Sequence, residues 1–322
     1  MKDQSKQIYK RIKKEIKKTP LEYNSELSEK TGAKIFLKTE NKQITGSFKF
    51  RGAISKLNYL RDLGVTNKKI VTASTGNHAA AVAMASQKMG FEALIFVPET
   101  ISKVKLEFIK QYDVEIIKKG RYSAETEILA AEYAQKMNLK FLHPYSDPQI
   151  IAGQGTIAIE LLEQLPELDA VFVPIGGGGL ISGIAQYLKS IKPAIKIIGC
   201  QAHHAPEMIE SIKLGKIVPP SEKNTIADGA AGGLDPETIT FNICQKYVDD
   251  YVLLTEEEIG YALYQIYKTT QQIVEPAAAL SVAAILKIAK DYKDKNLVAI
   301  LSGSRVNKAL FDEIIKRYRT DD

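Results

Sequence analysis

The sequence has few cysteines and no long apolar run. Cys200 and Cys244 are its only two cysteines, and neither belongs to a CxxC pair. This excludes a disulfide-framed scaffold and predicts two buried free thiols. The N-terminus lacks the apolar segment of a signal peptide, and no run reaches the roughly 18 apolar residues that a membrane-spanning helix needs. We therefore expect a cytoplasmic protein with no membrane partner.

The chain also lacks aromatic residues interleaved with basic ones, which argues against a nucleic-acid partner. Its net charge is +6, and the first 18 residues alone carry seven lysines and one arginine. One interpretation is a basic arm for a nucleic acid or a membrane. The interpretation we favour is the solvated face of an N-terminal helix, whose apolar stripe consists of Ile8, Ile12 and Ile16.

The nucleotide-binding fingerprints are missing as well. The glycine run Gly176–Gly179 does not fit GxGxxG, because the sixth position is Ile181 or Ser182 depending on where the count starts. The strand expected next ends in Gln201, where a ribose-binding acidic residue would lie. No GK[ST] follows the glycines, as a P-loop requires. A nicotinamide-dependent oxidoreductase is therefore disfavoured.

From about residue 68 onwards, short β-rich runs alternate with amphipathic stretches. We expect strands in KKIVTAS, EALIFVPE, VEIIKK, LKFLHP, IKIIGCQA and NLVAILSGS, a strand running into a helix in AVFVPIGGGG, and a strand followed by a helix in YVLLTEEE. Helices are expected over 77–89, 103–111, 124–136 and 149–164 and at the C-terminus. Thr255 and Glu258 form the S/T-x-x-E capping box that starts a further helix. This alternation predicts an α/β protein with parallel strands. Periodicity alone leaves a closed barrel and open sheets equally possible.

The strongest local signal is the tetraglycine turn in VPIGGGGLISG, which joins an expected strand to an expected helix. Consecutive glycines let backbone N–H groups converge on an anion, and the helix N-terminus adds a favourable dipole. Because the nucleotide fingerprints are absent, we predict a site for a single phosphate on a small cofactor. The plainer alternative is a tight turn that allows close helix packing.

Two other strand ends carry polar residues. In TASTGNHAAA, the stretch from Ser74 to Asn77 places hydroxyls, an amide and free N–H groups at a helix start, which suits a carboxylate. An ordinary N-cap turn is the alternative there. Ser302 follows the last strand, where an open parallel sheet presents its ligands, although a lone serine in such a place is more often a simple loop residue.

Lys49 lies in TGSFKFRGA between Phe48 and Phe50. Flanking aromatic rings can desolvate the amine, which lowers its pKa and frees it as a nucleophile toward an aldehyde. A phosphate site, a nucleophilic lysine and a carboxylate site are what an enzyme that uses pyridoxal 5'-phosphate (PLP) on amino acids needs.

These motifs carry a resemblance to a known family. The ordered segments that match span most of the chain and are GSFKFRGA, ASTGNHAAA, HPYSDPQIIAGQGTIAIE, VPIGGGGLISGI, TIADG, VEPAAA and LSGS. The chain resembles the fold-type II PLP enzymes and, within them, the serine/threonine dehydratase (threonine ammonia-lyase) and serine racemase group. The resemblance implies a tryptophan synthase β-like fold with two open parallel-sheet domains. A large PLP-binding domain would comprise residues 1–65 and 146–322, with a small α/β domain inserted at 66–145.

The resemblance also implies roles for single residues. Lys49 would hold PLP as a Schiff base and act as the catalytic acid and base, and Thr75 is a second catalytic candidate on the opposite face. The cofactor contacts would be Phe48, Asn77, Gly176, Gly177, Gly178, Gly179, Leu180 and Ser302. The carboxylate of a small amino-acid substrate would lie against Ser74, Thr75, Gly76 and His78. A homodimer or homotetramer is the expected assembly.

The expected reaction is β-elimination from L-threonine or L-serine, which gives 2-oxobutanoate or pyruvate plus ammonia. Lys49 would remove the α-proton, and the cofactor phosphate would protonate the leaving hydroxyl. Alternatives within the class are a serine racemase and a dehydratase for another β-hydroxy amino acid such as hydroxyaspartate. The Thr75 hydroxyl leaves the racemase open, and its extra methyl group equally allows that this proton transfer is blocked. From other classes, the alternatives are an NAD-dependent oxidoreductase and a non-catalytic sensor of a phosphate ligand.

One departure from the family pattern concerns a divalent cation. Where related enzymes have a glutamate ligand, this chain has Gln201, followed by Ala205 and by a retained Glu207. A neutral amide is a poorer ligand for a hard cation than a carboxylate. We therefore expect no metal at these three positions.

Overall fold

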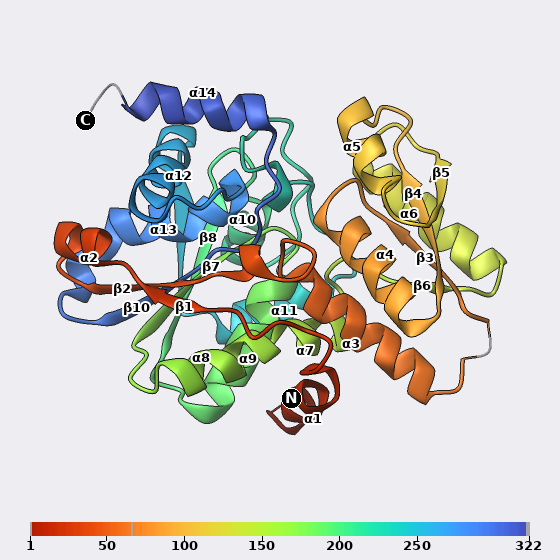
Figure 1. Cartoon of the computed structure of the whole chain (residues 1–322), viewed down its shortest axis with the longest axis horizontal. Helices are drawn as coiled ribbons and strands as arrows, with labels where there is room; N and C mark the ends of the chain where they lie inside the picture. The colour runs from red at the N-terminus through yellow and green to blue at the C-terminus, as the bar shows by residue number, and fades with distance from the viewer. Residues whose placement is uncertain (1, 66, 320–322) are drawn as a thin grey trace.

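Two β-sheets organise the computed structural model, which describes residues 2–65 and 67–319 (Figure 1). The larger sheet has the strand order β1-β2-β10-β7-β8-β9 and the smaller one β5-β4-β3-β6. The larger sheet consists of β1 (Leu21–Tyr23), β2 (Lys34–Lys38), β7 (Ala170–Pro174), β8 (Lys196–Ala202), β9 (Asp250–Leu254) and β10 (Asn296–Ile300). The smaller sheet consists of β3 (Lys69–Ala73), β4 (Glu92–Val97), β5 (Glu115–Lys118) and β6 (Lys140–Phe141).

Both sheets are open and almost entirely parallel, which confirms the predicted fold class and decides against a closed barrel. β1 alone among the paired strands of the described residues runs antiparallel, against β2 at the edge of the larger sheet. β2 pairs with β10, so residues 34–38 lie beside residues 296–300. The two ends of the chain therefore meet in one sheet, and β1 and β2 are strands that the alternation in the sequence did not reveal.

Helices cover both faces of the larger sheet. They are α2 (Ser25–Thr31), α7 (Pro148–Gln154), α8 (Thr156–Gln164), α9 (Gly179–Ile191), α10 (Glu207–Leu214), α11 (Ile239–Tyr247), α12 (Glu256–Thr270), α13 (Pro276–Ile288) and α14 (Lys308–Arg319). The described residues also include the short 3₁₀ turns η1 (Glu40–Lys42), η2 (Asp228–Ala230) and η3 (Ala289–Tyr292). Successive residues of β7 point to opposite faces. Phe172 packs in the core with α12 and α13, whereas Val171 and Val173 pack in the core with α8 and α9.

The smaller sheet also lies between helices. α4 (Asn77–Met89) and α5 (Lys103–Ile109) share an apolar core with one face, and α6 (Ser123–Lys136) packs on the other. α3 (Lys49–Asp62) contacts both α4 and α7, so it joins the helices of the two sheets (Figure 1). α1 (Lys2–Ile12) packs against α3, α7, α8 and α9. The position of α3 therefore depends on both sheets.

The N-terminal segment matches the expected stripe with one correction. Ile8, Ile12 and Ile16 are all buried in the core that contains α3, which supports the interpretation as a solvated helix face. However, α1 ends at Ile12, so Ile16 reaches the same core from the turn that follows the helix.

A second correction concerns the helix expected over 149–164, which is two helices that meet at Gly155. A Cβ atom at Gly155 would lie 2.8 Å from the carbonyl oxygen of Gly183. The chain therefore approaches α9 at this point more closely than any side chain would permit. The capping box of α12 is confirmed, because Thr255 and Glu258 each accept the other's backbone N–H.

The two thiols behave as predicted within the described part of the chain. Cys200 and Cys244 are buried and free, and burial raises the pKa of each thiol. Among residues 2–65 and 67–319, no helix combines the length and the apolar character needed to cross a membrane.

Candidate active site

A cavity of about 1000 Å³ lies where strands from both sheets end. Its wall includes the residues that follow β3, β7 and β10, the first residue of α3, and parts of α5 and α6. Ligands of open parallel sheets bind in this place, outside the carboxyl ends of the strands. The cavity brings together segments that are as far apart in the chain as Phe48 and Asn307.

Lys49 is the first residue of α3 and faces this cavity. Its Nζ donates a hydrogen bond of 2.9 Å to the carbonyl oxygen of Pro144. Burial lowers the pKa of Lys49 to about 8, although the carboxyl groups of Glu127 and Glu275 act in the opposite direction. Lys49 is therefore a much better nucleophile at neutral pH than a solvated lysine.

The two flanking aromatic residues differ in position. The ring of Phe48 lines the cavity, with its centroid 5.3 Å from the Lys49 amine. Phe50 is fully buried in the core between α3 and the smaller sheet. The difference arises because consecutive helical residues point about 100° apart. Of the two flanking rings, only that of Phe48 lines the cavity beside the amine. The remaining desolvation of the amine comes from the surrounding fold.

The tetraglycine turn after β7 also lines the cavity, together with Leu180. Gly178 has a φ of +81° and precedes α9, whose first backbone N–H groups have no acceptor within the helix. A Cβ atom at Gly177 would lie 2.4 Å from the ring of Tyr145. The turn therefore needs glycine for its backbone angle and for its close approach to Tyr145, and it presents bare N–H groups to an anion.

The polar turn from Ser74 to His78 faces the cavity from the end of β3. Asn77 Nδ2 donates to both carboxylate oxygens of Glu275, at 3.0 and 2.8 Å, whereas its Oδ1 is buried without a partner. Burial, together with the positive charge of Lys49, lowers the pKa of His78 to about 3. His78 is therefore neutral and adds no positive charge to the turn.

Ser302 is buried beside the cavity and is connected directly to the lysine segment. Its carbonyl oxygen accepts the backbone N–H of Phe48 at 3.1 Å. Ser47 and Gly303 form an isolated antiparallel bridge next to it. The first and the last motifs of the sequence are therefore held together by backbone hydrogen bonds.

Two cavity carboxyl groups were not singled out from the sequence. Burial raises the pKa of Glu275 to about 7, opposed by the hydrogen bond from Asn77. Burial likewise raises the pKa of Glu127, on α6, to about 7, opposed by Lys49. Glu275 lies in the VEPAAA segment, so a motif drew attention to its neighbourhood. Nothing local marks Glu127, which reaches the cavity only because α6 packs beside it.

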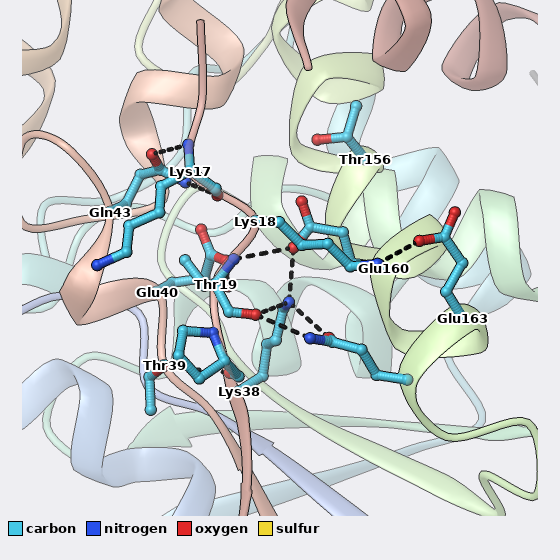
Figure 2. Close-up of polar contacts among 12 residues, drawn as sticks. Lys17, Lys18, Thr19, Lys38, Thr39, Glu40, Gln43, Thr156, Glu160 and Glu163 are labelled. Atoms are coloured by element: carbon cyan, nitrogen blue, oxygen red, sulfur yellow. Dashed lines mark hydrogen bonds and ion pairs between the residues drawn. The ribbon is translucent and has the colours of Figure 1, made fainter. Parts of the chain in front are cut away.

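A fully buried cluster of charged side chains connects α3 to the larger sheet, and its member on α3 lies two residues after Lys49. We call it the Arg51 cluster, and its members are Lys38, Glu40, Arg51 and Glu160. Arg51 pairs with Glu40 at 2.8 Å and with Glu160 at 2.7 Å. Lys38 completes the cluster, with its amine 2.6 Å from Glu160 (Figure 2). Two positive charges thus face two negative ones.

The three positions considered for a cation are not among the residues that line the cavity, although Ala205 follows the cavity residue His204. Gln201 Oε1 accepts the backbone N–H of Ile209, and Glu207 Oε1 accepts that of Ser221. Ala205 offers no side-chain ligand. In the part of the chain that the structure describes, no group of three His, Cys, Asp or Glu side chains could hold a metal ion, and we derive no step through one.

All the predicted cofactor and substrate positions line one cavity, and they fit a phosphorylated aldehyde. The glycine turn offers N–H groups to a phosphate, Lys49 offers an amine to an aldehyde, and the unpartnered Asn77 Oδ1 offers an acceptor to a hydroxyl. Fold and site together define a PLP-dependent enzyme of fold-type II.

Comparison with known proteins gives the same class. A family model described as pyridoxal-phosphate dependent enzyme matches residues 12–303, and the chain therefore belongs to this family. It is 39% identical over 312 residues to an L-threonine ammonia-lyase from Thermotoga maritima, covering 97% of this chain and 77% of the relative. This membership leaves the oxidoreductase and sensor alternatives without support.

Solved structures resemble the chain over nearly its whole length. The processed form of threonine deaminase isoform 2 from Solanum lycopersicum superposes with a TM-score of 0.90 at 34% identity, covering 98% of this chain and 88% of that one. Serine racemase from Dictyostelium discoideum gives a TM-score of 0.87 at 37% identity, covering 95% and 98%.

Proposed function

We propose that the protein is a PLP-dependent ammonia-lyase that converts L-threonine to 2-oxobutanoate and ammonia, and L-serine to pyruvate and ammonia. The observation that carries the proposal is the Lys49 amine, with its pKa of about 8, in a cavity shared with the tetraglycine turn. The names of the threonine ammonia-lyase and threonine deaminase relatives support the choice of substrate.

Each part of the cofactor can be assigned to a group of cavity residues. We assign the phosphate to the N–H groups of Gly176–Gly179 and Leu180, the ring hydroxyl to Asn77, the ring nitrogen to Ser302 and the ring edge to Phe48. When bound, the cofactor supplies an electron sink for negative charge at the substrate Cα atom.

The chain's own groups perform the remaining tasks. The neutral Lys49 amine accepts the proton from the substrate Cα atom, because its lowered pKa leaves roughly a tenth of it unprotonated at pH 7, far more than in an ordinary lysine. The backbone N–H groups and hydroxyls of the turn from Ser74 to Gly76 bind the substrate carboxylate. His78 supports this turn as a neutral ring, with its Nε2 3.3 Å from the carbonyl oxygen of Leu142.

We also propose the domain division 1–65 and 146–322 for the large domain and 66–145 for the small one. The membership of β3 to β6 in one sheet supports it. A homodimer or homotetramer remains our proposal from the family resemblance, to be measured by light scattering. The two buried, unpaired cysteines support a reducing, cytoplasmic location.

The test begins with the colour of the purified protein. Protein reconstituted with PLP should be yellow. Borohydride should remove its visible absorption band and attach the reduced cofactor covalently to Lys49. Lys49→Ala should show neither this band nor the release of keto acid. Lys110→Ala, which changes an exposed lysine at the end of α5, should keep both. A protein that takes up no PLP, or that is labelled elsewhere, would refute the assignment.

A serine racemase activity is the second candidate. Thr75 lines the cavity and carries a hydroxyl, and a serine racemase is among the similar structures. A hydroxyl on the face opposite Lys49 could return a proton to the Cα atom. The yield of D-serine against that of pyruvate, compared between wild type and Thr75→Val, measures this contribution. Assays with a panel of hydroxy amino acids, including hydroxyaspartate, test the other substrates.

A further inference from the structure

We propose that Glu127 is the proton donor to the β-hydroxyl group that leaves the substrate. The proposal rests on the ammonia-lyase function proposed above and deepens it, because it names the side chain that handles the leaving group. It differs from the family-based expectation that the cofactor phosphate gives this proton.

Glu127 is held at the cavity by the first turns of α6. The neighbouring Thr126 is buried, and its hydroxyl donates to the carbonyl oxygens of Lys119 and Tyr122, both at 3.0 Å. These bonds fix the start of the helix against the loop before it. Glu127 is partly buried and lines the cavity that Lys49 also faces.

Glu127 differs from the other carboxyl groups that line the cavity. Asp228 pairs with Lys105, Glu256 accepts the N–H of Ile226, and Glu275 accepts from Asn77. For Glu127, the described residues 2–65 and 67–319 provide no hydrogen-bond or ion-pair partner within contact distance. A carboxyl group without a partner in a substrate cavity is free to exchange a proton with a ligand.

Three groups from other elements act on this carboxyl group or lie beside it. Lys49 of α3 favours its charged form, and Asp235, before α11, disfavours it. The Tyr145 phenol is the third, and burial raises its pKa above the usual value, so it stays neutral. Burial is the largest influence on Glu127 and raises its pKa to about 7, a value suited to proton transfer near neutral pH.

The carboxyl group of Asp235 is itself in hydrogen-bond contact with His143. The Nδ1 atom of His143 accepts the backbone N–H groups of Tyr145 and Ser146, so the proton of the neutral ring is on Nε2. That Nε2 lies 3.1 Å from Asp235 Oδ2 and donates to it. Asp235 Oδ2 is therefore engaged by His143, whereas the carboxyl group of Glu127 has no such partner among the described residues.

The proposed step balances its protons and electrons. Lys49 removes the proton from the substrate Cα atom, and the electron pair of that C–H bond forms the Cα=Cβ double bond. The Cβ–O bond breaks with its electron pair on oxygen, and Glu127 gives its proton to that oxygen, which leaves as water. From L-threonine the resulting enamine, 2-aminobut-2-enoate, hydrolyses to 2-oxobutanoate and ammonia. Lys49 then releases its added proton to solvent, and Glu127 takes up a proton from solvent.

The test compares a leaving group that needs a proton with one that does not. We would assay the holoenzyme and its Glu127→Gln, Glu127→Asp and Glu132→Gln variants with L-threonine and with 3-chloro-L-alanine. Because general acids contribute roughly 100- to 10,000-fold, Glu127→Gln should lower kcat for threonine by about 100-fold or more, and for chloroalanine by less than about 5-fold. The kcat of Glu127→Asp for threonine should lie between those of wild type and Glu127→Gln. Glu132→Gln, at an exposed position of α6, should have the kcat of wild type.

A second readout does not depend on turnover. Infrared difference spectra of the full-length protein should show protonated carboxyl bands that titrate with midpoints near 7, one from Glu127 and one from Glu275. The Glu127 band should be missing in Glu127→Gln and present in Glu275→Gln and in Glu132→Gln. A Glu127 band with a midpoint near 4.5, or a spectrum that loses no titrating band in Glu127→Gln, would overturn the proposal.

The outcomes separate the two proposals. If Glu127→Gln slows both substrates equally, or leaves threonine turnover unchanged, Glu127 is not the donor. If wild type releases no keto acid from any hydroxy amino acid, the ammonia-lyase function fails and this role for Glu127 falls with it. The infrared titration would still report whether the carboxyl group behaves as the structure indicates.

Discussion

The first turn of α3 carries two cationic side chains in opposite surroundings, a fully buried Arg51 and a partly buried Lys49. Arg51 makes ion pairs with two fully buried glutamates, and the four charges of the Arg51 cluster sum to zero. Lys49, two residues earlier, has only the carbonyl oxygen of Pro144 as a hydrogen-bond partner among the described residues. The carboxyl groups that influence it, Glu127 and Glu275, act without an ion pair to it.

The pKa values follow this difference. Burial opposes the charge of Arg51, but Glu40 and Glu160 outweigh burial and hold its pKa above the usual value. Burial dominates at Lys49 and lowers its pKa to about 8. Buried charges that are fully paired fix the structure, whereas buried charges left unpaired can change protonation during a reaction. The same helix turn therefore contains an anchor and a reactive group.

The largest expected effect is on the anchor. Arg51→Met leaves Glu40 and Glu160 buried without their main partner, and breaking a buried pair in this way costs about 3–5 kcal/mol. Urea denaturation of the cofactor-free full-length protein measures the free energy of unfolding. The matched variant Lys49→Met removes a poorly solvated cation without breaking an ion pair, so it should leave that free energy unchanged or raise it. Equal losses in both variants would erase the proposed distinction.

The next effect is on the pH dependence of Lys49. Only the neutral amine attacks an aldehyde, so the rate of PLP uptake by the cofactor-free protein should rise with pH and level off above about 8. An ordinary lysine would give a midpoint near 10.5. Stopped-flow absorbance at a series of pH values determines the midpoint. A midpoint near that of free lysine would show that the amine is solvated and that its surroundings are not as described.

The sequence predicted the parts of this comparison unequally. The tetraglycine turn, the turn at Ser74 and Ser302 could be placed together, because each follows a parallel strand and such strand ends converge. Lys49 could be chosen because it lies in a motif. The roles assigned to these residues stay predictions until they are measured.

Other features depend on tertiary packing and could not be predicted. Phe50 was expected to shield the amine, but the helical rotation turns it into the core. Glu127 reaches the cavity only through the docking of α6, and the Arg51 cluster needs residues from β2, η1, α3 and α8 to meet. Charge pairing across such separations leaves no periodic signal in the chain.

A smaller effect concerns stability in acid. Because burial holds the folded-state pKa of His78 at about 3, below its ordinary 6.5, the unfolded chain binds a proton between these values that the folded chain does not. The stability that this group contributes is therefore complete above pH 6.5 and is lost as pH falls. Between pH 6.5 and 5 the loss is about 1.6 kcal/mol.

Paired unfolding curves of wild type and His78→Asn isolate this contribution from that of the carboxyl groups. The difference between their free energies of unfolding should move by that amount in favour of the variant as pH falls from 6.5 to 5. His203→Asn, at an exposed position, should show no such drift. A difference that does not depend on pH would mean that His78 titrates normally in the folded protein.

The smallest expected effect ranks the two carboxyl groups that act on Lys49. Both raise its pKa, Glu127 more than Glu275, so removing either charge should lower the midpoint of PLP uptake. We expect Glu127→Gln to lower it by less than about one unit and Glu275→Gln by less than that, while Glu132→Gln leaves it unchanged. The reverse order would indicate that Glu275, despite its hydrogen bonds with Asn77, keeps more of its charge than Glu127 does. Glu127 would then still be protonated at the pH of that midpoint, and Glu275 would carry the charge that acts on Lys49.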